Sequence, residues 1–245
     1  MDIPSCIPRV EPSPSHRKFV EYAEPDCVMI NLIGVRRLLK RGETAASYFP
    51  DGTSVMVTST IPDEKLELIS WEKERDLIRE FSPDYHLPTD YPTYGDQPSD
   101  QRLENVRRCM DGTVWMMQEL EDTDITVIPL VKGVQSRERR VCYEVCDELG
   151  KQITAYYATQ HFTSNGNNIT AVEQQVEAIA EYGELDVIVI GLLSPNYLER
   201  LSDGVIAATG QYQWRSRVAP SKQSEDEVQD TFETLSADVK ESLNT

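Results

Sequence analysis

The sequence predicts an α/β fold, and three observations favour a (β/α)8 barrel of the TIM type. Short apolar runs recur along the 245-residue chain, separated by stretches with helical spacing. Several runs lack polar alternation, which is typical of parallel strands covered by helices on both faces. The glycine signatures of open nucleotide-binding sheets, GxGxxG and the P-loop, do not occur. We therefore expect a closed parallel barrel with one short or irregular eighth element.

A single domain is expected from the chain length. Residues 1–18 contain four prolines among polar residues, which predicts a flexible, extended arm. The barrel is expected over residues 19–219. Residues 220–245 are acidic and partly helical in pattern, and the sequence leaves open whether this tail docks or stays mobile.

The first half of the chain predicts three strands. An apolar run at 27–33 is followed by a short helix that ends at Gly42, and a Phe-Pro-Asp-Gly turn precedes the strand at 54–58. Pro62 and Asp63 begin a helix that continues to about residue 80. The strand at 84–88 leads through an acidic loop to a helix at 101–120, whose apolar residues keep 3- and 4-residue spacing.

The second half predicts four more strands. The run at 125–131 is strongly strand-like, and the helix at 134–149 ends before Gly150. The strand at 153–158 is followed by a loop rich in Gly and Asn, and then by a helix that ends at Gly183. The strand at 186–192 precedes Ser194-Pro195, a typical helix start, and the last strand is expected at 205–209.

The composition is strongly acidic, with 42 Asp and Glu against 24 Lys and Arg and a net charge of −18. Such a surface is typical of proteins from high-salt cytoplasm, where salt screens the repulsion, so we predict a halophilic source. The alternative is an ordinary acidic cytosolic protein with a charged tail. Nucleic-acid binding normally needs a basic face, and here basic residues cluster only locally. A nucleic-acid partner would therefore have to use a small patch.

Five cysteines form no CxxC pair. Cys142 and Cys146 lie four residues apart on a predicted helix, which favours burial over metal binding. No metal and no cofactor are expected. The sequence has no signal-peptide pattern and no apolar run of membrane-spanning length, so we expect a cytoplasmic protein without a membrane partner. The oligomeric state is open, a homodimer included.

Candidate site residues follow the predicted strands, because a barrel collects its chemistry at the C-terminal ends of the strands. Asp90 could serve as a nucleophile, a base or a ligand contact, or it could cap its own loop. Lys132 could contact a ligand or form an ion pair with Asp90. His161 could transfer protons or be hydrogen-bonded within its loop, whereas His86 lies within a strand and is expected to be structural.

Several motifs in series resemble the barrel core of tRNA-guanine transglycosylases, including their DNA-modifying relatives. They are SPDYHLPTD, RLENVRRCMDGTVWM, VIPLVKG, AYYATQHF, VIVIGLLSPNYLERLSDGV and QWRSR, which together span roughly residues 50–218. The resemblance implies exchange of guanine for a 7-deazaguanine in tRNA or DNA, through a covalent intermediate. It places Asp90 at the aspartate that reads the base, Lys132 at a base-reading glutamine, and Ala158 and Thr159 near glycines that contact the base.

The chain departs from the family pattern at three places. The segment that carries a catalytic aspartate is here 58–63, the family nucleophile falls on 207–209, and the zinc site is missing. Asp63 or Asp90 would have to supply the missing carboxylate. The expected site is as follows: catalytic Asp90 and Asp63; substrate-binding Tyr91, Lys132, Thr159, Gln160 and His161; nucleic-acid phosphates at Arg215 and Arg217. The alternative is an inactive barrel that acts as a binding or structural protein, encoded by a halophilic virus or plasmid.

Overall fold

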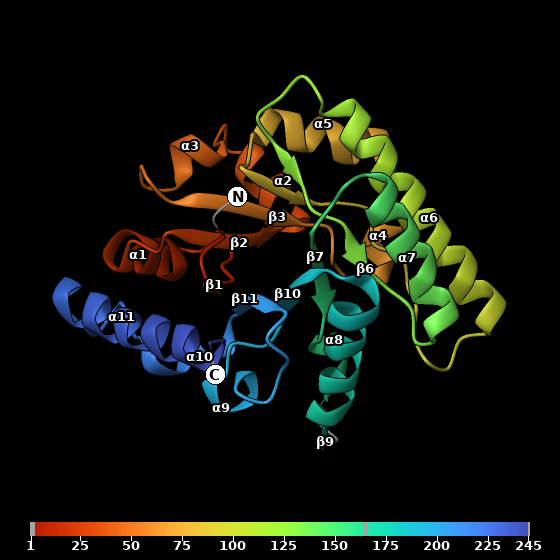
Figure 1. Cartoon of the computed structure of the whole chain (residues 1–245). Coiled ribbons are helices and arrows are strands. Elements are labelled where there is room, and N and C mark those ends of the chain that lie inside the picture. Colours follow the sequence, from red (N-terminus) through yellow and green to blue (C-terminus); the bar gives the residue numbers. More distant parts are fainter. Residues whose placement is uncertain (1–2, 164–165, 245) are drawn as a thin grey trace.

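Strands and helices alternate along the chain in the computed structural model, which describes residues 3–163 and 166–244 (Figure 1). The parallel strands are β1 (Cys6–Pro8), β2 (Cys27–Asn31), β3 (Ser54–Thr58), β4 (Tyr85–Leu87), β5 (Thr126–Val127), β6 (Leu130–Val131), β7 (Ile153–Tyr157), β10 (Asp186–Ile190) and β11 (Val205–Gly210). A small antiparallel hairpin joins β8 (Phe162–Thr163) to β9 (Gly166–Asn167).

Helices surround the strands in Figure 1. They are α1 (Pro14–Ala23), α2 (Leu32–Leu39), α3 (Ala45–Tyr48), α4 (Asp63–Leu66), α5 (Trp71–Phe81), α6 (Ser99–Glu119), α7 (Ser136–Glu148), α8 (Ile169–Gly183), α9 (Pro195–Leu198), α10 (Tyr212–Arg217) and α11 (Glu225–Ser242), with a 3-10 turn, η1, at Thr159–His161. No helix in the described ranges has the length and apolar character needed to cross a membrane.

The strands form two parallel sheets, in the order β1-β11-β10-β7-β6 and β2-β3-β4-β5. The prediction of an α/β domain with parallel strands is therefore confirmed, while closure into a barrel stays a prediction. The predicted strand at 125–131 is interrupted at Ile128-Pro129, since proline has no N–H for a sheet ladder. This segment still contacts both sheets: Ile128 N–H donates to His86 C=O, and Ala155 N–H donates to Pro129 C=O, both at 2.9 Å.

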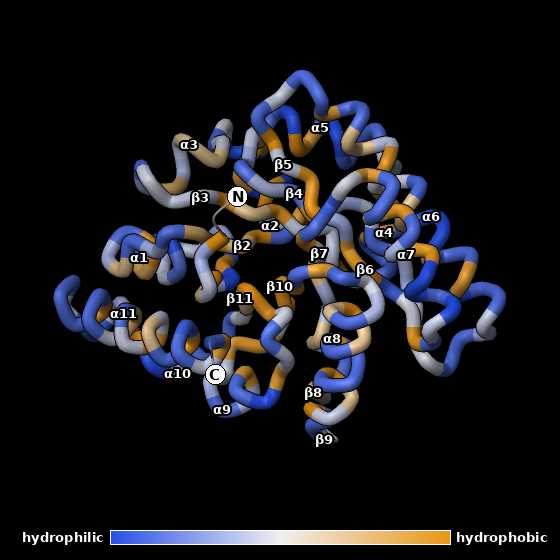
Figure 2. Tube along the Cα trace, viewed as in Figure 1, coloured by the Kyte–Doolittle hydropathy of each residue, from blue (hydrophilic) through white to orange (hydrophobic). Residues whose placement is uncertain are grey.

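The sheets also approach each other beside β1. Arg9 forms a single parallel bridge with Met29, and the Val10 N–H donates to the Met29 C=O at 2.8 Å. Apolar residues divide into two clusters, one between the strands and the helices and one among the strands. Figure 2 shows much of the hydrophobic colour on the strands. The cluster among the strands contains Ile3, Ile7, Cys27, Met29, Met56, Leu87, Ile128, Leu130, Ala155, Ile188, Ile190 and Ala207.

The predicted flexible arm at residues 1–18 is wrong for its described part. β1 pairs with β11, and its three residues are buried. Ser13 then caps α1 by accepting from the His16 N–H at 3.3 Å, with Pro14 in the first turn, where a missing N–H does no harm. Two of the four prolines that suggested an arm, Pro8 and Pro14, therefore lie at the end of a strand and the start of a helix. Residues 1 and 2 of the predicted arm lie outside the described residues.

The acidic tail docks, which answers the question that the sequence left open. Ser224 and Glu227 form a capping box at the start of α11. The helix lies beside α1 in Figure 1 and buries Val228, Phe232, Leu235 and Val239. The Phe19 ring stacks on Trp214 at 4.0 Å between centroids and meets Phe232 edge-on at 5.3 Å. Residue 245 of the predicted tail lies outside the described residues.

Candidate functional site

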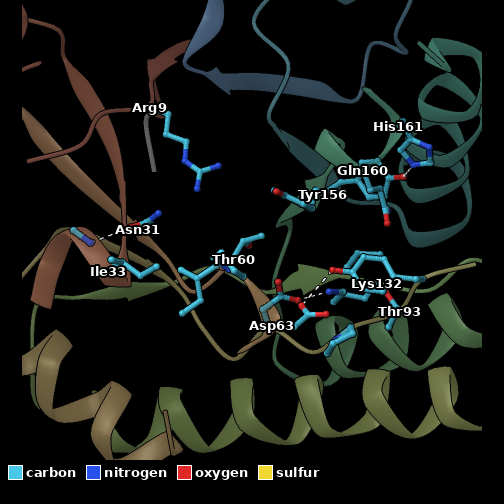
Figure 3. Close-up of a pocket in the computed structure, with 18 of the residues that line it drawn as sticks. Arg9, Asn31, Ile33, Thr60, Asp63, Thr93, Lys132, Tyr156, Gln160 and His161 are labelled. Carbon is cyan, nitrogen blue, oxygen red and sulfur yellow. Dashed lines mark hydrogen bonds and ion pairs between the residues drawn. The ribbon is translucent and has the colours of Figure 1, made fainter. Parts of the chain in front are cut away.

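A cavity of about 520 Å³ lies at the C-terminal ends of the strands. Its wall is built by the segments that follow β1, β2, β3, β4, β6 and β7. Its polar residues include Arg9, Glu11, Asn31, Arg37, Thr60, Asp63, Asp90, Thr93, Tyr94, Lys132, Tyr156, Tyr157, Gln160, His161 and Gln175. Figure 3 shows several of these side chains converging from separate strands. The volume suits a small organic ligand.

Asp90 and Lys132 form an ion pair in this wall, through Lys132 Nζ and Asp90 Oδ1. Their side chains are only 10% and 11% exposed. Burial raises the pKa of Asp90, and Lys132 offsets part of that rise. Burial alone lowers the pKa of Lys132, but the Asp90 carboxylate together with Cys109 and Tyr94 outweighs this, so the net pKa is raised. Of the two alternatives for Lys132, the ion pair is present, and it faces the cavity.

Asp63 and Tyr94 lie close to this pair. The Tyr94 hydroxyl donates to Asp63 Oδ1 at 3.2 Å, and the negative charge of Asp63 contributes to the raised pKa of Asp90. Burial and the nearby Asp63 carboxylate raise the pKa of Tyr94. Figure 3 places Asp63 and Lys132 on the same side of the cavity. Two carboxylates, one ammonium and one phenol therefore share this end of the site.

A buried carboxylate, Glu74 of α5, positions the segment that carries Asp90. Its Oε1 accepts from the Thr89 N–H and pairs with His86 Nε2, both at 3.0 Å, and it also accepts from the Ser59 hydroxyl. His86 Nδ1 lies 3.2 Å from the Val57 carbonyl, so both ring nitrogens are engaged and the predicted structural role of His86 fits. The network ties the ends of β3 and β4 to α5.

Thr89 has a left-handed backbone, with φ of 45°, which is uncommon outside glycine. Its hydroxyl donates to the Cys109 C=O at 3.0 Å. A Cβ on Gly112 would lie 2.7 Å from Thr89 Cγ2, so only glycine lets α6 approach this closely. The strained residue before Asp90 is thus held from two sides, as is common at ligand sites.

Glu138 of α7 organises the segment after Lys132. Its carboxylate accepts from the N–H groups of Val134 at 2.7 Å and Gln135 at 3.0 Å, and it pairs with Arg102 at 2.9 Å. Burial alone raises the pKa of Glu138, but these hydrogen bonds and Arg102 outweigh it, and the net pKa is lowered. Gly133, at φ of 111°, makes the turn between Lys132 and this anchor.

The segment after β7 adds a hydrogen-bonded group opposite Lys132. The Tyr156 hydroxyl and His161 Nε2 lie 2.8 Å apart, and Gln160 also bonds to Tyr156. Burial lowers the pKa of His161 and raises that of Tyr156. The imidazole is therefore mainly neutral at pH 7, and its Nε2 accepts a hydrogen bond from the Tyr156 hydroxyl, which keeps its proton. This matches the alternative in which His161 is hydrogen-bonded within its own segment.

Four predicted site residues lie outside the cavity wall. The Tyr91 hydroxyl accepts from Trp71 Nε1 at 2.8 Å, and its ring packs under Arg108. The Thr159 hydroxyl is buried, with no partner among the described residues, and packs against Gly191. Arg215 and Arg217 lie on α10, where Arg217 pairs with Asp238 of α11 at 3.1 Å.

Several residues of the wall are not predicted from the sequence. Arg9 follows β1, in the segment that the sequence predicts as an arm. Arg37 lies on α2, and Tyr94 lies in the acidic loop after β4. Tyr156 and Tyr157 are the last two residues of β7, and this position at the end of a strand could have predicted them from the sequence.

All five cysteines are buried free thiols. Over residues 3–163 and 166–244, no three His, Cys, Asp or Glu side chains are grouped so that they could hold a metal ion. Comparison with protein-family models finds no match to this chain, and comparison with curated protein sequences finds none either.

Proposed function

We propose that the two sheets close into one (β/α)8 barrel whose cavity binds a guanine-type base. Three features support closure. The 126–131 segment contacts both sheets at one seam, Arg9 bridges to Met29 at the other, and the cluster among the strands draws residues from around the whole ring. Counting the β5–β6 segment as one strand and including β1, the ring has eight parallel strands in chain order.

The observation that carries the base site is the cavity-facing Asp90–Lys132 pair. Asp90 stands where the resemblance to tRNA-guanine transglycosylases places the base-reading aspartate. A carboxylate accepts several hydrogen bonds, so Asp90 can hold Lys132 and the N–H donors of guanine together. Lys132 can donate to the guanine carbonyl or N7, both of which are acceptors. The rings of Tyr156 and Tyr157 supply apolar surface for a planar ligand.

Base exchange in tRNA or DNA is the function that the resemblance implies, and Asp63 is the candidate for its nucleophile. The Asp63 carboxylate would attack the sugar carbon that bears the base, and the guanine would leave with the bonding electrons and take up a proton from water, which the incoming base later returns. The incoming 7-deazaguanine would then displace Asp63, give up its ring-nitrogen proton and restore the carboxylate. Tyr94, hydrogen-bonded to Asp63, orients it for this attack.

A second candidate is a base-binding protein without exchange. Ala207, Ala208 and Thr209 occupy the position of the family nucleophile and are fully buried. With no carboxylate at that position, the cavity still has Asp90 and Lys132 to recognise a base, but it lacks the family's nucleophile for covalent transfer. The buried free thiols favour a reducing compartment under either candidate, and we propose the cytoplasm.

Calorimetry with guanine and 7-deazaguanine tests the base site. Asp90→Asn keeps the shape and removes the charge, and it should weaken binding about ten- to a hundredfold, as expected when a charged hydrogen-bond partner is lost. Asp96→Asn is the matched control, because Asp96 is exposed in the same loop and lies outside the cavity wall. A wild-type protein that binds neither base refutes the base site.

Exchange is tested separately by following labelled guanine into tRNA and into DNA. Incorporation that Asp63→Asn abolishes supports the transferase. Tight base binding without incorporation into either nucleic acid supports the binding protein instead.

A further inference from the structure

The main chain of Arg9 is held in place by hydrogen bonds to neighbouring segments. Its N–H donates to the Gly210 C=O at 2.9 Å, and its C=O accepts from the Trp214 indole N–H at 3.1 Å. It also forms the parallel bridge with Met29. Figure 3 shows the guanidinium extending from β1 into the cavity. The main chain that carries this side chain is therefore held by contacts that involve no ligand.

The Arg9 guanidinium forms no hydrogen bond or ion pair with any described residue, although the chain has 42 acidic residues against 24 basic ones. Arg37 of α2 lines the same cavity, is exposed, and likewise forms no ion pair in the described part of the chain. Glu11, the acidic residue that follows β1, accepts instead from the Gln211 amide at 3.2 Å. Two arginines are thus left available for an anion that comes from outside.

Arg9 and the Asp90–Lys132 pair lie on different sides of the cavity. Along the strand order, β2, β3 and β4 separate β1 from the β5–β6 segment in one direction, and β11, β10 and β7 separate them in the other. Figure 3 agrees, with Arg9 across the opening from Lys132. A ligand that contacts both must have a base-like group at one end and an anionic group at the other.

We propose that Arg9 and Arg37 form a phosphate subsite, which takes the phosphate of a guanine nucleotide whose base lies at Asp90 and Lys132. The base end rests on the proposed function, whereas the anion end rests on the two arginines alone. Guanidinium groups bind phosphate through paired N–H donors in a planar fork. The phosphate could belong to a free nucleotide or to a nucleic-acid strand, and the same chemistry recognises both.

The test compares guanosine, guanosine 5′-monophosphate and inorganic phosphate as calorimetric probes at constant KCl. Wild-type protein should bind the monophosphate about ten- to a hundredfold more tightly than guanosine, the effect of one charge-assisted contact. Arg9→Gln should remove that preference. Arg37→Gln should reduce the preference. Arg36→Gln should preserve it, because Arg36 lies on the same helix but not in the cavity wall.

Equal binding of guanosine and its monophosphate by the wild type overturns the subsite, as does a preference that survives Arg9→Gln. Binding of inorganic phosphate tests the phosphate subsite independently of the base site. Phosphate binding that Arg9→Gln abolishes supports the subsite even where guanine does not bind. Guanine binding without phosphate binding overturns the subsite and leaves the base site intact. A guanine-containing single strand, compared with the monophosphate in wild type and Arg9→Gln, identifies the source of the phosphate.

Discussion

Replacing Glu138 with Gln should destabilise the protein strongly, because it leaves a buried arginine without its partner. The Glu138 side chain is fully buried, and that of Arg102 is 5% exposed. Removing one partner of such a pair costs about 3–5 kcal/mol. For a domain of this size each kcal/mol corresponds to a fall in Tm of about 2–4 °C, so the Tm should fall by about 6–20 °C.

Thermal melts of Glu138→Gln and Glu144→Gln at several pH values measure this effect. Glu144 lies on the same helix and pairs with Arg140, but those side chains are 62% and 76% exposed, so its loss should cost less than about 1 kcal/mol. Because the pKa of Glu138 is lowered in the folded protein, its contribution to stability should increase as the pH rises. Its contribution is complete above the unfolded pKa of about 4.3 and is lost as the pH falls through the lower folded pKa.

The difference between wild type and Glu138→Gln should therefore be largest near neutral pH and should shrink in acid. A Glu138→Gln variant no less stable than Glu144→Gln would refute the reasoning, and so would a difference independent of pH.

Three further predictions concern the site and the surface. Lys132→Met should lower the Tm because it leaves Asp90 unpaired. The double variant with Asp90→Asn should lose less stability than the sum of the two single losses. If thermal melts show that the losses add, the two residues are not coupled. Gly112→Ala should lower the free energy of unfolding by about 1–3 kcal/mol and weaken guanine binding, because the new Cβ displaces Thr89. Gly95→Ala is the control: its Cβ would meet no atom within 4 Å, so neither stability nor guanine binding should change. With a net charge of −18, the Tm should rise in molar KCl, and an unchanged or lower Tm would remove the prediction of a halophilic source.

Most strands could be predicted because burial leaves a local signature. The runs at 54–58 and 186–192 have uninterrupted apolar centres at 55–57 and 187–190, and the structure has β3 and β10 there. β1 could not be predicted in the same way. It has three residues and ends in proline, and its stability comes from pairing with β11, nearly the whole chain away. Such a strand is specified by its partners rather than by its own residues.

The residues of the candidate site likewise differ in whether the local sequence could predict them. Asp90, Lys132, Gln160 and His161 follow strands that the pattern revealed, and the structure places all of them in the cavity wall. Tyr91 follows Asp90 directly, but its ring turns away to meet Trp71. Local sequence locates the end of a strand, whereas the direction of each side chain beyond it depends on packing between helices that are distant in sequence.

The two ends of the cavity differ in how their charges are balanced, and this difference bears on what the cavity can select. At the Asp90 end Lys132 is paired with Asp90 and Tyr94 donates to Asp63, so a ligand gains there by adding hydrogen bonds of defined geometry rather than by being an anion. At the Arg9 end the positive charge has no partner in the described part of the chain, so a ligand gains there by being an anion. On a chain of net charge −18, long-range attraction of a polyanion is weak, and recognition has to come from these short-range contacts. A nucleotide that supplies both a base with N–H donors and a phosphate would satisfy both ends, whereas a free base or a simple phosphate would satisfy only one.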